Sequence, residues 1–199
     1  GTNMNFTIQS AVRDAEKTSG ATVAEVAAAI SMGSLMGARG NSGVILSQLL
    51  RGIAKGLEGV KEAGAQQLAL ALQTGVETAY KAVMRPVEGT ILTVAREVAK
   101  GALASAKQGA EPLQVLKDAY QRGQITLEKT PDMLPTLKQA GVVDAGGQGF
   151  LIILSGWIAA LEGQDLAEEV SAPPKEAPQV EAPTRGITQV EDLEFPYCT

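Results

Sequence analysis

The stretch MGARGNSGVILSQLLRG, residues 36–52, joins a glycine-containing turn to the start of an amphipathic helix. Glycine adopts positive φ readily, so Gly37, Gly40 and Gly43 would let the backbone turn sharply and approach a ligand closely. Asn41 and Ser42 are residue types that cap helix N-termini. The first N–H groups of a helix point outward with the positive end of its dipole, and they bind anions such as phosphate. The stretch therefore predicts a phosphate site at a helix N-terminus.

The same glycines allow a second interpretation. Gly33, Gly37 and Gly40 recur at helical spacing, and small residues at that spacing let two helices pack closely. The turn would then have a packing role only, and the residues alone leave both interpretations open.

Two further stretches place glycine where a helix begins. In RPVEGTILTV, residues 85–94, a proline ends one helical stretch and Thr90 puts a hydroxyl near the start of the next. In AGVVDAGGQGFLIIL, residues 140–154, Gly141 is expected to stop a helix and Asp144 to cap the following one. Glycine in a helix costs about 1 kcal/mol relative to alanine, so three such helix starts in one small protein call for a reason.

Together the three stretches resemble the nucleotide-binding loops of the DhaL (Dak2) kinase domain, and GARGNSG, PVEGTIL and GVVDAGGQGF are similar to its fatty acid kinase A branch. The opening residues GTNMNF are similar to the family segment that follows an aspartate-rich DGDTG loop. The resemblance covers residues 1–163 and resumes at the end of the chain. It implies a barrel of antiparallel helices that holds ATP or ADP at one rim.

The resemblance also implies which residues contact the nucleotide. Arg39 departs from the small residue expected in the dihydroxyacetone branch. The implied contacts are Thr2 and Asn3 at the phosphates beside the metals, Ala38, Arg39, Gly40, Asn41 and Ser42 around phosphate, Thr90 at the nucleotide, and Asp144, Ala145 and Gly146 along its cleft.

Magnesium is implied as well, but its ligands in this family are the aspartates of the DGDTG loop. The present sequence begins one residue after the threonine of that loop, so we expect those ligands and the family's first helix to lie upstream. The chain's own aspartates are scattered and lack the close spacing of a magnesium–phosphate site. We therefore predict no metal ligand within this chain, assign no catalytic residue, and expect this fragment alone to be inactive.

The composition predicts an all-α domain. Hydrophobic residues make up 45% of the 199 residues and aromatic residues only 4%, with many helix-forming residues. Apolar residues recur at helical spacing, for example Leu72, Val76 and Ala79, which predicts buried stripes. No stretch is typical of a strand, and short connections predict antiparallel neighbours. About eight helices are expected, at residues 3–17, 22–32, 42–57, 64–83, 89–108, 112–128, 132–139 and 146–162.

Charge and cysteine content narrow the class of protein. The formal net charge of −5 argues against a nucleic-acid binder, whose basic face would dominate. The one cysteine, Cys198, cannot form an internal disulfide, so we expect a cytoplasmic protein. No apolar stretch reaches the roughly 20 residues that a membrane-spanning helix needs.

A change in composition predicts the domain boundaries. We expect a nucleotide-binding helical domain at residues 1–166 and a linker rich in proline, glutamate and alanine at 167–187. Residues 188–199 regain apolar and aromatic side chains and resemble the start of the next domain in fatty acid kinase A; an arbitrary apolar end is the alternative.

The implied reaction is transfer of the ATP γ-phosphate to a fatty acid carboxylate presented by a DegV-like fatty-acid-binding partner. A carboxylate is already an anion at neutral pH and needs no general base, whereas a sugar-like hydroxyl needs one. The sequence contains no histidine, which is compatible with an acyl-phosphate product. Two alternatives stay open: a dihydroxyacetone kinase DhaL-type subunit, and a non-catalytic nucleotide-binding or scaffold module. A homodimer would form through regions outside this chain.

Overall fold

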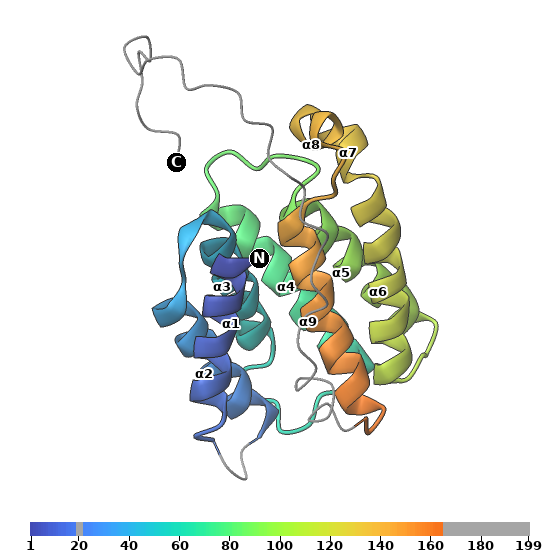
Figure 1. Ribbon diagram of the computed structural model, residues 1–199. Helices are drawn as coiled ribbons and strands as arrows, with labels where there is room; N and C mark the ends of the chain where they lie inside the picture. Colours follow the sequence, from blue (N-terminus) through green and yellow to red (C-terminus); the bar gives the residue numbers. More distant parts are fainter. Residues whose placement is uncertain (19–21, 165–199) are drawn as a thin grey trace. The chain divides into compact units, whose positions relative to one another are not determined.

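The computed structural model describes residues 1–18 and 22–164, and this part of the chain forms nine helices and no strand (Figure 1). The prediction of an all-α bundle is confirmed. The expected linker and the expected start of a further domain, residues 167–199, lie outside the described residues. The helices are α1 (Thr2–Ala15), α2 (Val23–Gly37), α3 (Gly40–Gly56), α4 (Ala65–Ala82), α5 (Ile91–Lys107), α6 (Pro112–Glu128), α7 (Thr130–Met133), α8 (Pro135–Ala140) and α9 (Ala145–Leu161).

Consecutive long helices pack side by side in antiparallel order from α1 to α6, and α9 packs against α5 and α6. Because each long helix reverses the direction of the one before it, α1, α3 and α5 begin at the same end of the bundle. The short helices α7 and α8 stay at this end, so α9 begins there too (Figure 1). We call it the upper end, after its place in Figure 1, and define it by the first residues of these four helices, Thr2, Gly40, Ile91 and Ala145.

The core is built from aliphatic side chains that the long helices share. Leu49 of α3, Leu92 of α5 and Leu154 of α9 are at most 2% exposed. The predicted stripe on α4 is buried as well, including Leu72 and Val76. Burial of such side chains contributes about 1.5–3 kcal/mol each, so this core holds the helix starts of the upper end in place.

Glycines in and just before the first quoted stretch allow α1 to pack tightly against α2 and α3. A Cβ on Gly33 would lie 2.6 Å from the Ser10 carbonyl oxygen of α1, and one on Gly37 would overlap the Ser10 side chain. A Cβ on Gly43 would lie 2.6 Å from Thr7 Oγ1. The packing interpretation therefore holds for Gly33 and Gly37, and of the stretch's glycines only Gly40 has a positive φ, +59°.

The expected end of α2 and the expected start of α3 are both wrong. Helix α2 continues past residue 32 to Gly37, because close packing on α1 outweighs the low helix propensity of its glycines. Helix α3 begins at Gly40, two residues earlier than expected. Asn41 and Ser42 consequently lie inside the first turn of α3, and no side chain caps this helix. The expectation that these two residues are caps is therefore wrong.

The single helix expected at residues 132–139 is also wrong, because the structure has α7 and α8 in its place. The break falls at Leu134, whose φ of −127° and ψ of 107° are extended. A proline disfavours helical backbone at the residue before it, and Pro135 follows directly. Proline at the first position of α8 is in turn well tolerated.

No helix in the described part of the chain combines the length and apolar composition that crossing a bilayer requires.

The close helix contacts predict opposite effects for two glycine-to-alanine substitutions. A Cβ on Gly52 of α3 would lie 2.6 Å from the Gly75 Cα of α4, whereas one on Gly156 of α9 would meet no heavy atom within 4 Å. We expect Gly52→Ala to destabilise the fold by about 1–3 kcal/mol through overpacking. The matched variant Gly156→Ala should stabilise it by about 0.5–1 kcal/mol.

Urea unfolding of the two variants measures this difference. Equal stabilities for Gly52→Ala and Gly156→Ala would contradict the packing at the α3–α4 contact.

Candidate functional site

At the upper end, the start of α1 lies against the connection between α2 and α3. A Cβ on Gly40 would overlap the side-chain Nδ2 of Asn3, so the Asn3 amide covers this glycine. One turn further along α1, the buried Thr7 Oγ1 donates a hydrogen bond to the Asn3 carbonyl at 2.9 Å. Thr2 is the exposed neighbour of Asn3. The structure therefore brings the implied contacts of α1 together with those at residues 38–42.

The connection from α2 to α3 is short and extended. Ala38 and Arg39 have extended backbone, and the chain turns into α3 at Gly40. The exposed Arg39 guanidinium donates to the Ala38 carbonyl at 2.8 Å. This cation is therefore held beside the first turn of α3.

The first turn of α3 has free hydrogen-bond donors. Within the described residues, the backbone N–H groups of Asn41 and Ser42 donate to no acceptor, and no side chain caps the helix. Helix α2 differs, since Thr22 and Glu25 close its N-terminus with a capping box. The N-terminus of α3 is thus left to other acceptors, which is the condition for anion binding.

The start of α9 carries the cap predicted for it. Asp144 Oδ2 accepts a hydrogen bond from the Gly147 N–H at 2.6 Å, and Gly141 ends α8 with a φ of +66°. Both predictions are confirmed. Ala145, the first residue of α9, is exposed, whereas Gly146 is buried.

The glycines of α9 approach neighbouring helices. A Cβ on Gly146 would lie 3.2 Å from the Ile91 Cβ of α5, and one on Gly149 would lie 2.9 Å from the Met4 Sδ of α1. These small residues therefore bring the start of α9 onto the starts of α5 and α1.

Thr90 directly precedes α5 and places a hydroxyl at its N-terminus, as predicted. Its Oγ1 donates to the Val87 carbonyl at 2.8 Å and does not cap the helix. Because Ile91 packs against Gly146, Thr90 and the start of α9 belong to one group. The implied contacts thus form two groups at the upper end: Thr2, Asn3 and residues 38–42 in one, and Thr90 and residues 144–146 in the other.

A polar cluster beside Thr90 was missed by sequence reasoning. Glu88 accepts two hydrogen bonds from the Arg96 guanidinium, at 2.7 and 2.8 Å. The Thr93 hydroxyl donates to the same carboxylate at 2.9 Å and accepts from the Gly89 N–H at 2.9 Å. Hydrogen bonds from Arg96 hold the pKa of the Glu88 carboxyl below its ordinary value of 4.5. The cluster fixes the turn that leads into α5.

Magnesium does not fit the described residues, since among residues 1–18 and 22–164 no three His, Cys, Asp or Glu side chains lie together as a metal site would require. Asp144 is engaged in capping and Asp132 lies in the neighbouring α7. We assign no step to a metal held by these residues.

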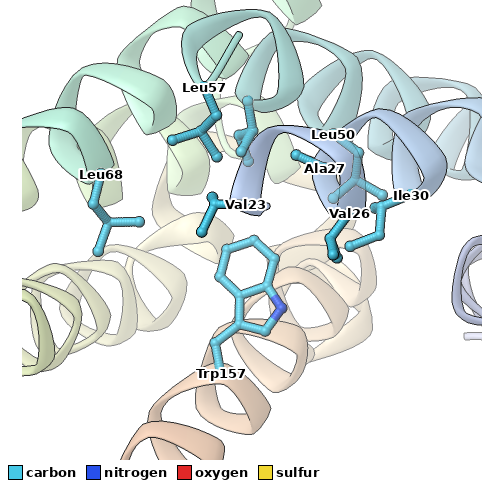
Figure 2. A pocket seen from close by; sticks show the side chains of 9 residues that line it. Val23, Val26, Ala27, Ile30, Leu50, Leu57, Leu68 and Trp157 are labelled. Carbon is cyan, nitrogen blue, oxygen red and sulfur yellow. The ribbon is translucent and has the colours of Figure 1, made fainter. Parts of the chain in front are cut away.

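An apolar cavity of about 310 Å³ lies away from both groups. Val23 begins α2 and Leu57 follows the end of α3, so the cavity lies toward the opposite end of the bundle. Figure 2 shows the Trp157 ring of α9 pointing toward Val23. The lining contains no charged side chain that would hold a phosphate; it comprises Val23, Val26, Ala27, Ile30, Leu50, Ile53, Leu57, Leu68 and Trp157.

The Glu88–Arg96 pair predicts a pH-dependent contribution to stability. The folded-state pKa of Glu88 is lowered, so the pair stabilises the fold fully above pH 4.5 and loses this contribution as the pH falls through the folded-state pKa. We expect Glu88→Gln to lower the free energy of unfolding at pH 7 and to have a smaller effect at pH 3. Chemical unfolding of the parent and the variant at both pH values measures this loss of stability. Added salt should reduce the stability difference between parent and variant at pH 7. An equal effect at both pH values would contradict the ion pair.

Comparison with known proteins shows the family of this chain. Residues 1–159 match the DAK2 domain. The chain is 43% identical over 202 residues to Protein YloV of Bacillus subtilis (strain 168) and 44% identical over 200 residues to an uncharacterized protein of Staphylococcus haemolyticus (strain JCSC1435). Each alignment covers all of this chain and 36% of the relative, so the chain spans about a third of the length of these relatives. The resemblance to the DhaL (Dak2) domain is confirmed, and the chain belongs to the DAK2 domain family, a kinase-related family associated with nucleotides.

Proposed function

We propose that this chain is the ATP-binding domain of a kinase that transfers the γ-phosphate of ATP to a fatty acid carboxylate. A DegV-like fatty-acid-binding protein would present the carboxylate, and the product would be an acyl phosphate. The observation that carries the proposal is that the three glycine-bearing helix starts, at Gly40, Gly89 and Gly146, lie at one end of the bundle.

Phosphate would bind at the first turn of α3. The free N–H groups of Asn41 and Ser42, together with the positive end of the helix dipole, suit an anion. Because neither side chain is used as a cap, both are free to donate to phosphate oxygens as well. Arg39 adds a positive charge beside this turn, and Gly40, with no Cβ, leaves room for the Asn3 amide next to it.

The rest of the nucleotide would lie along the second group. Thr90 would contact it from α5, while Asp144, Ala145 and Gly146 would line its cleft from α9. The Asp144 carboxylate is held by the Gly147 N–H, which accounts for an acidic residue beside a phosphate site. Thr2 and Asn3 would close the phosphate end from α1, since Asn3 already contacts Gly40.

The chemistry requires little beyond positioning and charge neutralisation. A carboxylate oxygen forms a bond to the γ-phosphorus, the bond from that phosphorus to the β–γ bridging oxygen breaks, and ADP leaves with the electron pair. The nucleophile is an anion at neutral pH, so no side chain has to remove a proton. Magnesium would supply charge neutralisation from ligands outside the described residues.

The proposal extends to parts of the protein that this chain does not include. The relatives are nearly three times as long as this chain. For the whole protein we propose an acyl-carrying partner, a homodimer formed through other regions, and a cytoplasmic location. Residues 1–166 would be the nucleotide-binding domain, 167–187 a linker and 188–199 the start of a further domain.

The phosphate site predicts a loss of affinity for one double variant. In the full-length natural protein that carries this sequence, Asn41→Ala with Ser42→Ala should weaken ATP binding by about 1–3 kcal/mol, because hydrogen bonds to a charged group are lost. Calorimetric titration with ATP and magnesium measures it.

The matched control is Gln66→Ala with Gln67→Ala. These residues hold the same positions in the first turn of α4, which begins at the other end of the bundle. Equal affinities for the two double variants would remove the α3 turn from the site.

The substrate can be tested separately. We expect the full-length protein with ATP, magnesium and a DegV-like protein loaded with fatty acid to form ADP and a product that hydroxylamine converts to a hydroxamate, since acyl phosphates react in this way. Phosphorylation of dihydroxyacetone in place of the fatty acid would favour the DhaL-type alternative. Nucleotide binding without turnover of either substrate would favour a non-catalytic module.

A further inference from the structure

The one-turn helix α7 lies between the two helix starts that form the second group of candidate contacts. It follows α6 at the upper end and contains the buried Thr130. The Thr130 hydroxyl donates to the Leu127 carbonyl at 2.7 Å and accepts a hydrogen bond from the Asp144 N–H at 3.0 Å. One buried hydroxyl therefore joins the end of α6 to the residue that caps α9.

The turn before α5 also packs against α7. Gly89 has a φ of +83°, and a Cβ on it would lie 3.1 Å from the Thr130 carbonyl oxygen and 3.0 Å from the Met133 Cβ. The Gly89 N–H is held from the other side by the Thr93 hydroxyl. The turn that carries Thr90 therefore packs against α7.

The segment between Thr130 and Asp144 buries no other residue that could hold the start of α9 in place. None of residues 131–143 is buried, and α8 contributes no buried residue. Thr130, by contrast, is 0% exposed. The Thr130–Asp144 bond is thus the buried anchor at which the chain returns from α8 to the bundle.

We propose that Thr130 is a positioning residue that holds the starts of α5 and α9 at a fixed spacing, so that Thr90 and residues 144–146 contact the same nucleotide. This role rests on the proposed nucleotide site, but the claim that Thr130 holds the two helix starts in place is argued from the contacts alone. Thr130 contacts Asp144 directly and Gly89 by packing, and it is not itself one of the implied nucleotide contacts.

The test uses three variants in the full-length natural protein. Thr130→Val keeps the volume and removes the hydroxyl, Thr130→Ser keeps the hydroxyl, and Thr126→Val removes a buried hydroxyl of α6 that only donates to the Arg122 carbonyl. Urea unfolding verifies that each is folded. Hydrogen exchange without nucleotide at residues 86–91 and 142–147 measures how readily the two helix starts open. Calorimetry measures ATP affinity.

We expect Thr130→Val to speed exchange in both segments and to weaken ATP binding about tenfold. Thr130→Ser and Thr126→Val should stay close to the parent in both measurements. The proposal is overturned if Thr130→Val matches Thr126→Val, or if Thr130→Ser is as impaired as Thr130→Val. If the parent binds no ATP, the proposed function fails, while faster exchange in both segments would still support the positioning role and unchanged exchange would overturn it.

Discussion

Antiparallel packing of consecutive helices is the constraint on which the rest of this structure depends. It places the N-termini of α1, α3, α5 and α9 at one end, although their first residues are up to 143 positions apart in the sequence, from Thr2 to Ala145. Helix N-termini carry partial positive charge and free N–H groups. Four of them gather at the upper end, where they suit an anionic ligand, whereas the opposite end, where α2, α4 and α6 begin, carries the apolar cavity.

The glycines at the upper end mostly serve this packing. Gly33, Gly37 and Gly43 bring α1 against α2 and α3, while Gly146 and Gly149 bring α9 against α5 and α1. Gly40 is different, because its positive φ turns the chain into α3 and its missing Cβ leaves room for the Asn3 amide. The cost of glycine within helices is thus offset by close contacts that place the helix starts side by side, and the candidate site follows from the packing.

The helices and most of their bounds could be predicted because apolar spacing, glycine and proline are local signals. The Asp144 cap and the Gly141 stop were predicted for the same reason, and the packing role of Gly33 and Gly37 was one of two interpretations of their spacing. The residue types of Asn41 and Ser42 predict caps, but the chain turns at Gly40 and both residues lie within the first turn of α3.

Other features depend on contacts between residues far apart in the sequence. The Thr130–Asp144 bond spans 14 residues, and the Glu88–Arg96 pair joins a turn to the second turn of α5. A threonine before a proline gives no sign of a buried anchor. Glu88 stands in a quoted stretch, yet its partner could be identified only once α5 was known to begin at Ile91.

Protection from hydrogen exchange by bound nucleotide tests the central claim most directly, because it reports where on the bundle the ligand lies. With saturating ATP and magnesium, the full-length natural protein should show slower exchange at residues 38–43 and 143–147, where the starts of α3 and α9 donate to or line the ligand. Residues 64–68, at the start of α4 on the opposite end, should not change. Protection at the opposite end, or saturable binding with no protection at the starts of α3 and α9, would contradict a nucleotide site at the upper end.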